Sequence, residues 1–275
     1  MKSPTNLFYR HARIGTSVLA LALLPLANQA RADVTLTDGS STALVDVNSS
    51  AGMHYWGVNG QNQLSQQWFW YRTDNGLVNP INNLSAATVN QTAANAMTST
   101  YNNGVFGVTI SYLLKYNGVG SADITEGISV HNNSLSDAVF HLYQYSNFDL
   151  LGNPNGDTIS VDNGSAFQTK GINNIAEGII VPNANFYEAN VTGGSGSGST
   201  LDKFATVAGL NLNNVGTATG DVTWAFQWDL LVPASSTMDV YKDKLLEVYV
   251  VPEPSSLALI GLGMAALSLR RRRSA

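Results

Sequence analysis

Three histidines are the side chains best suited to acid–base chemistry, because imidazole changes its charge near neutral pH. They are His54, His131 and His141, while the fourth, His11, lies in the N-terminal segment. No G-x-S-x-G motif supplies a serine nucleophile, and the absence of cysteine excludes a thiol nucleophile, a disulfide and a thiolate metal site. His141 lies in an aromatic segment, where a packed or surface-facing imidazole is commoner than a base. We therefore predict no catalytic residue.

Acidic residues are plentiful, but no spacing singles out a carboxylate pair at the separation that glycosidases need. The segment 149–162 has acidic and amide residues at offsets close to those of a calcium loop. Leu151, however, stands where the first acidic ligand should be, and an Asn-Pro-Asn-Gly turn at 153–156 explains the segment without a metal. We therefore predict no metal and no cofactor, with calcium kept as the alternative.

Aromatic and amide side chains together suit a sugar, because rings stack on sugar faces and amides bond hydroxyl groups. Trp224 and Trp228 stand at the alternating apolar positions of their segment and are predicted to lie in the core. Trp68 and Trp70 share a face with Arg72 and are the better candidates for glycan contact.

Charge narrows the class of partner. The chain is 44% hydrophobic and 12% charged, against about 25% charged residues in ordinary domains. The stretch from Asp33 to Pro254 holds six bases against 19 acids, a net charge of −13. This argues against binding of nucleic acid or of an anionic membrane, and favours cations or neutral polymers as partners.

The N-terminal segment has the composition of a signal peptide. Lys2, Arg10 and Arg13 precede an apolar run at 14–27, which is shorter than a membrane span needs. The sequence Ala30-Arg31-Ala32 supplies the small-x-small cleavage pattern, so the mature chain is predicted to start at Asp33, with cleavage after Ala30 as the alternative.

The C-terminal segment has three parts in a fixed order. Pro252, Glu253 and Pro254 precede an apolar run at 257–269, which as a helix rises only about 20 Å, too short for a robust span. A basic cluster follows, which holds that end in the cytoplasm by the positive-inside rule. Its members are Arg270, Arg271, Arg272 and Arg273.

These 25 residues resemble the PEP-CTERM sorting signal, with Pro252-Glu253-Pro254 as its motif. The resemblance implies processing by an exosortase, a membrane-embedded enzyme of Gram-negative bacteria that make exopolysaccharide. The blocks at 141–145 and 220–228 are also similar to segments of other PEP-CTERM proteins, which implies a recurring β domain.

Between the terminal segments the hydrophobic pattern has a period of two residues. Alternation at 106–116 and 222–230 predicts half-buried strands. Asn-Gly dipeptides such as Asn103-Gly104 and Asn117-Gly118 mark hairpin turns, and a Gly/Ser-rich loop follows at 192–198. Weaker strand candidates include 42–47, 67–72, 124–131, 138–145, 158–161, 176–181, 204–210 and 245–251, and the Ala-rich stretch Ser85 to Thr98 is a helical candidate.

We therefore predict an all-β fold, a single jelly-roll-like sandwich of about ten strands at 33–250, with a signal-peptide helix at 1–32 and a sorting signal containing a short helix at 251–275. The predicted function is that of a non-enzymatic structural protein of the cell surface or the exopolysaccharide and biofilm matrix. The chain would be anchored transiently in the inner membrane before processing. A carbohydrate-binding module is the alternative, and a polysaccharide hydrolase comes third.

Overall fold

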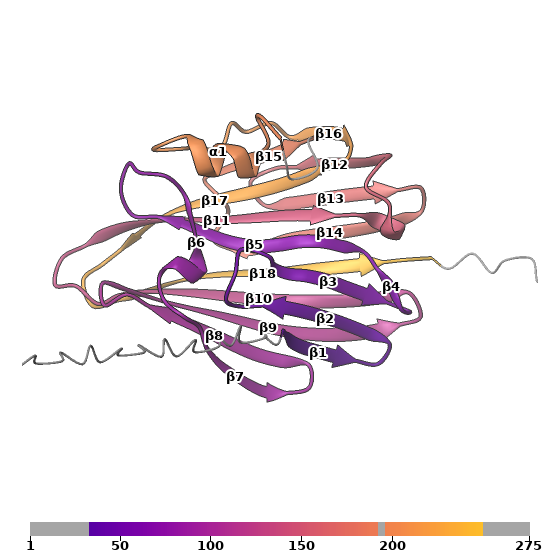
Figure 1. Cartoon of the computed structure of the whole chain (residues 1–275), viewed down its shortest axis with the longest axis horizontal. Helices are drawn as coiled ribbons and strands as arrows, with labels where there is room; N and C mark the ends of the chain where they lie inside the picture. Colours follow the sequence, from indigo (N-terminus) through magenta and orange to yellow (C-terminus); the bar gives the residue numbers. More distant parts are fainter. Residues whose placement is uncertain (1–32, 192–195, 250–275) are drawn as a thin grey trace, which may run out of the picture. The chain divides into compact units, whose positions relative to one another are not determined.

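The computed structural model describes residues 33–191 and 196–249. This part of the chain forms two nine-stranded sheets packed face to face (Figure 1). The predicted all-β sandwich is confirmed. The expected strand number of about ten is too low, because several short strands at the sheet edges carry no clear alternation.

One sheet, called sheet A, has the strand order β1-β2-β3-β5-β11-β17-β15, with β4 pairing with β3 and β6 with β5. All of its pairings are antiparallel except a short parallel contact between β3 and β5. The strands are β1 (Val34–Asp38), β2 (Ser41–Asp46), β3 (Gly52–Val58), β4 (Gln61–Asn62), β5 (Leu64–Arg72), β6 (Asn79–Pro80), β11 (Ala138–Phe148), β15 (Phe186–Asn190) and β17 (Thr223–Val232).

The other sheet, called sheet B, is antiparallel and has the order β16-β12-β13-β14-β18-β10-β9-β8-β7. Its strands are β7 (Thr88–Ala93), β8 (Ala96–Asn102), β9 (Phe106–Gly118), β10 (Ser121–Asn132), β12 (Asp157–Val161), β13 (Ser165–Lys170), β14 (Asn173–Val181), β16 (Thr217–Gly220) and β18 (Thr237–Glu247). Two 3-10 turns, Ile81–Asn83 and Leu150–Gly152, and one helix, α1 (Thr200–Thr206), complete the described elements.

The core lies between the two sheets and follows from strand alternation. On β9, Val108 and Ile110 are fully buried and lie opposite Val130 and Ile128 of β10. Apolar residues at every second position thus face inward, while threonines and serines between them face solvent. Trp224 and Trp228, predicted as core, are both fully buried.

Two predicted elements are wrong. The stretch Ser85 to Thr98 is not helical, because β7 and β8 pair with each other there and β8 also pairs with β9. The predicted strand at 204–210 begins instead as α1, since the Ser199 side chain accepts a hydrogen bond from Asp202 N and caps the helix. Strand pairing thus decides the conformation at 85–98, and a local helix cap decides it at 200–206.

Within residues 33–191 and 196–249, no helix has the length and apolar character that a membrane span requires. The predicted signal peptide and the apolar run at 257–269 lie outside the described residues.

Candidate acid–base site on the outer face of sheet A

Strand β11 directs alternate side chains to opposite faces of sheet A. Phe140 packs against Phe106 of sheet B with ring centroids 5.1 Å apart, and Gln144 Nε2 donates to Glu177 of sheet B. The even-numbered side chains therefore point into the sandwich. Since successive residues of a strand alternate, His141 and Tyr143 belong to the outer face.

His141 forms a dyad with Asp229 of the neighbouring strand β17. The two residues are cross-strand partners, and His141 Nδ1 lies 2.6 Å from Asp229 Oδ1. The side chains are 18% and 28% exposed respectively. The dyad is thus held by the sheet but accessible to a ligand in solvent, as an acid–base pair must be.

Amide groups fix the carboxylate of Asp229. Gln227 Nε2 donates to Asp229 Oδ1 at 2.9 Å and to Asn211 Oδ1 at 2.8 Å. Gln227 Oε1 accepts from Leu212 N at 3.0 Å, which sets the orientation of the amide. Asn185 Oδ1 accepts from Asp229 N at 2.8 Å. Gln227 therefore orients the carboxylate, the segment at 211–212 orients Gln227, and Asn185 holds the backbone of Asp229.

A buried cation lies beside the dyad. Arg72 on β5 is the cross-strand partner of His141 and is only 4% exposed. Its Nε donates to Tyr143 Oη at 3.3 Å, and Tyr143 Oη donates to Leu210 O at 2.6 Å. Burial raises the pKa of Tyr143, and Arg72 partly opposes this. Tyr143 is therefore a neutral hydrogen-bond donor that holds the segment at Leu210.

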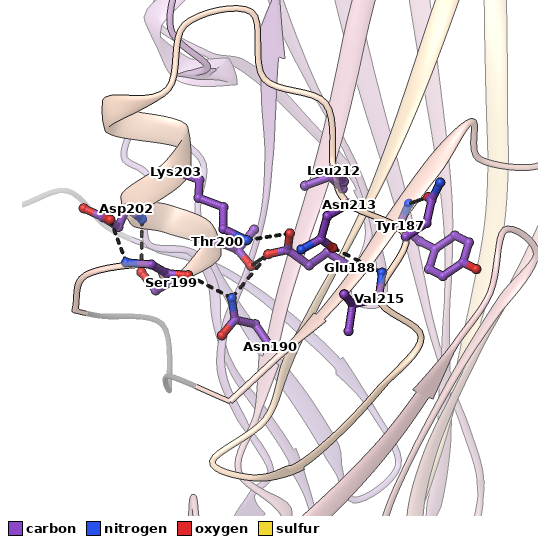
Figure 2. Close-up of polar contacts among 12 residues, drawn as sticks. Tyr187, Glu188, Asn190, Ser199, Thr200, Asp202, Lys203, Leu212, Asn213 and Val215 are labelled. Carbon is purple, nitrogen blue, oxygen red and sulfur yellow. Dashed lines mark hydrogen bonds and ion pairs between the residues drawn. The ribbon is translucent and has the colours of Figure 1, made fainter.

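Helix α1 and the segment that follows it cover part of this face. Figure 2 shows Glu188 of β15 pointing toward the helix, where its Oε1 accepts from Thr200 Oγ1 at 2.7 Å and its Oε2 from Lys203 Nζ at 2.7 Å. Phe204 of α1 packs between Trp70 and Tyr143, with ring centroids 5.4 Å from each. This cover fixes Leu210, Asn211 and Leu212, which hold Tyr143 and Gln227.

The two tryptophans proposed for glycan contact lie on the same strand as Arg72, and Trp70 is the cross-strand partner of Tyr143. Trp68 is fully buried and Trp70 is 4% exposed, so neither presents a ring face to solvent. Glycan contact by these two residues stays a prediction. Their burial argues against it.

A lysine from β13 reaches into the calcium-like loop at 149–162. Lys170 Nζ lies 2.5 Å from Asn153 O and from Asn155 O and 3.0 Å from Asp157 Oδ1. The ammonium group thus contacts oxygens that a cation would need. Among the described residues, no group of three or more His, Asp or Glu side chains is arranged to hold a metal ion.

Of the predicted terminal sites, only Asp33 belongs to the described residues, and its carboxylate lies 3.2 Å from His54 Nε2. Ala30 and Ala32 of the cleavage site, the motif Pro252-Glu253-Pro254 and the cluster Arg270 to Arg273 lie outside the described residues.

The sequence reasoning missed Asp229 and Gln227. The sequence does hold one indication. Gln227 and Asp229 alternate with Trp224 and Trp228 in the strand predicted at 222–230, so they belong to its opposite face. Nothing in one sequence, however, shows that this strand pairs with the one carrying His141.

Several solved structures share the fold. A bacterial glucoamylase complexed with acarbose matches with a TM-score of 0.58 and 10% identity, over 85% of this chain and 34% of that chain. A putative aldose 1-epimerase from Escherichia coli K12 matches with a TM-score of 0.53 and 10% identity, over 79% of this chain and 98% of that chain. A galactose mutarotase related enzyme from Lactobacillus acidophilus matches with a TM-score of 0.52 and 8% identity, over 78% of this chain and 97% of that chain.

This chain therefore spans about a third of the length of the glucoamylase, and nearly the full length of the other two proteins. At 8–10% identity the likeness shows the fold alone. No curated protein sequence matches the chain.

The prediction that this chain is not an enzyme is wrong, because the solved structures that share its fold contradict it. The proteins that share the fold are named as a glucoamylase, an aldose 1-epimerase and a mutarotase-related enzyme. The sequence led to the opposite conclusion because it contains no contiguous nucleophile motif.

A family model for the PEP-CTERM protein-sorting motif matches residues 250–273. The match covers the Pro-Glu-Pro motif, the apolar run and the arginine cluster in the predicted order. The chain is therefore a PEP-CTERM protein, exported and sorted by an exosortase.

Proposed function

We propose that the β domain is a carbohydrate-active enzyme that performs acid–base chemistry at the anomeric carbon of an aldose. The observation that carries this proposal is the His141–Asp229 dyad, which is oriented by Gln227 and partly open to solvent. The shared fold supports it, since proteins named as an aldose 1-epimerase and a mutarotase-related enzyme have the same architecture.

The dyad assigns a role to each ring nitrogen of His141. Because Nδ1 faces the Asp229 carboxylate, that nitrogen carries a proton in the neutral ring and leaves the lone pair on Nε2. Nε2 of His141 is thus the base, and Asp229 is its positioning partner.

The simplest reaction for one such base is interconversion of anomers. Nε2 removes the proton from the anomeric hydroxyl, the bond between the anomeric carbon and the ring oxygen breaks, and the ring oxygen takes the proton back. The open aldehyde then rotates and closes on its other face. No co-reactant is consumed, and general acid–base catalysis of this kind contributes about 100- to 10,000-fold.

The substrate class follows from charge and export. A net charge of −13 between Asp33 and Pro254 disfavours anionic sugars, so the substrate is a neutral aldose or the reducing end of a neutral glycan. We infer that the mature domain spans residues 33–250, after loss of the signal peptide at 1–32 and of the tail at 251–275. It would act at the cell surface or in the extracellular matrix.

Exchange NMR on unlabelled glucose or galactose tests this function. The purified protein should speed the exchange between the two anomers in proportion to protein concentration, and His141→Ala should abolish the gain. A carbohydrate-binding module, the alternative, would instead shift sugar signals by binding without speeding exchange, and that result would contradict the enzymatic proposal.

A further inference from the structure

Four charged side chains lie in the centre of the sandwich, away from the dyad. Glu126 of β10, Glu177 of β14 and Lys242 and Lys244 of β18 point inward from three neighbouring strands of sheet B. All are at most 1% exposed. Burial of ionised groups in such a site is costly even when they are paired, so the cluster needs an explanation beyond stability.

The strand register pairs each lysine with one glutamate. Lys242 is the cross-strand partner of Glu126, and Lys244 is the partner of Glu177. Lys242 Nζ is in direct contact with Glu126 Oε2 and lies 3.1 Å from Glu177 Oε1. Lys244 Nζ also contacts Glu126 Oε2. The Glu126 carboxyl thus lies against both amines.

The two glutamates differ in their surroundings. Trp224 Nε1 and Gln144 Nε2, both from sheet A, each donate to Glu177 Oε2 at 2.9 Å, an arrangement suited to a carboxylate. The Oε2 atom of Glu126, by contrast, contacts the amines of Lys242 and Lys244. Glu126 is therefore the glutamate whose carboxyl group lies directly against both lysine amines.

The two lysines differ as well. Lys242 packs over the ring of Phe69, 5.1 Å from its centroid. Burial, followed by the neighbouring charge of Lys244, lowers the pKa of Lys242 well below its usual value. Transfer of one proton from Lys242 to Glu126 makes these two groups a neutral amine and a neutral acid in contact, with Glu177 and Lys244 as the remaining pair.

We propose that Lys242 and Glu126 condense to form an intramolecular isopeptide bond between β18 and β10. A neutral carboxylic acid and a neutral amine are the two partners that amide formation requires, and the contact places the nucleophilic Nζ against the carboxyl group.

The reaction balances within the cluster. The Nζ lone pair of Lys242 attacks Cδ of Glu126, and Glu177, 3.1 Å from Nζ, accepts the proton that the nitrogen must lose. That proton passes to the departing hydroxyl group, which leaves as water. A C–N bond forms, a C–O bond breaks, and nothing is oxidised or reduced.

The cross-link suits the chemistry of this chain. An exported domain is commonly stabilised by disulfides, but this chain contains no cysteine. A bond between residues 126 and 242 closes a long loop, which constrains the unfolded chain as a disulfide would. It also converts two costly buried groups into one neutral amide.

Intact mass spectrometry of the purified full-length chain tests the bond directly. After the observed termini are taken into account, we expect the mass to fall below the sequence mass by one water molecule. Trypsin cleavage at Lys115 and Lys170 isolates the peptide containing Glu126. This peptide should appear joined to peptide 204–244, because trypsin does not cleave after an acylated Lys242.

Variants separate the proposed bond from other sources of mass loss. Lys242→Arg keeps the positive charge but cannot form the amide, so it should have the full sequence mass. Lys244→Arg is the matched control and should keep the deficit of one water. Glu126→Gln should lose ammonia in place of water, a difference of one mass unit that only condensation at this residue explains.

A wild-type chain with its full sequence mass would overturn the proposal. So would a deficit of one water without the joined tryptic peptides, or a deficit that persists in Lys242→Arg.

Discussion

His141 Nδ1 lies 2.6 Å from Asp229 Oδ1, although 88 residues separate the two in sequence. The contact depends on the pairing of β11 with β17, and on Gln227, which donates to the same carboxylate oxygen. The dyad is therefore a product of the sheet. Changes that disturb its cover should affect the site as well as stability.

Two buried tyrosines make a matched pair for testing that cover. Tyr143 Oη donates to Leu210 O at 2.6 Å, whereas Tyr112 Oη is buried without a hydrogen-bond partner. Tyr143→Phe should cost about 1 kcal/mol of unfolding free energy, and Tyr112→Phe should be neutral or stabilising. Urea unfolding of both variants measures this, and equal losses would contradict the assigned contacts.

Two aspartates near the end of β11 predict a dependence of stability on pH. Burial raises the pKa of Asp149, and the charge of Asp221 raises it further; burial also raises the pKa of Asp221. The folded state thus holds protons that the unfolded state releases, so this contribution to stability is complete below the ordinary value of 3.8 and is lost as pH rises through the raised values.

Replacing the carboxyl group of Asp221 removes its repulsion of Asp149. Asp221→Asn should raise the thermal midpoint relative to wild type at about pH 7, where both carboxyls repel, and not at about pH 3, where both are neutral. Calorimetry at the two pH values measures the difference. An equal rise at both would show that the effect is not electrostatic.

Gly52 is required by space as well as by backbone conformation. Its φ is +59°, and a Cβ atom there would collide with the Trp68 ring and Gln67 O. Gly60 has φ +78° with no heavy atom within 4 Å of the added Cβ. Gly52→Ala should therefore destabilise the fold by more than about 2 kcal/mol, and Gly60→Ala by about 1 kcal/mol, as measured by chemical denaturation. Equal losses would contradict the packing of β3 against β5.

The sorting motif gives a prediction about processing. Pro252, Glu253 and Pro254 form the motif that the family model matches, so changing the three residues to alanine should leave the tail uncleaved and the protein in the membrane fraction. Neutral residues in place of Arg270 to Arg273 should instead weaken retention of the precursor. Release of the alanine variant at the wild-type rate would refute the reading of this segment as an exosortase signal.

Periodicity in the sequence was sufficient to predict an all-β sandwich, because apolar residues recur at every second position along β9 and along most of β17. It was not sufficient where partners decide the structure. The stretch Ser85 to Thr98 is Ala-rich, yet it becomes a hairpin through pairing with β9. At Phe204 a pattern typical of a strand yields to a helix that is capped by Ser199 and held by Glu188.

The sorting signal could be read from sequence because its parts are contiguous, and the match at residues 250–273 confirms it. The dyad and the Glu126–Lys242 contact could not, since each joins strands that are far apart in the chain. Trp68 and Trp70 were chosen as binding candidates because they share a face with Arg72, but that face is covered at both positions.

The rate of anomer exchange in His141→Gln, compared with wild type and with His131→Gln, tests the central claim most directly. His131 is the matched control, because it lies on β10 of sheet B and its ring contacts Thr237 Oγ1 at 3.0 Å, away from the dyad. We predict that His141→Gln lowers the catalysed rate by at least about 100-fold and that His131→Gln leaves it unchanged. Equal rates in all three proteins would contradict the assignment of His141 as the base.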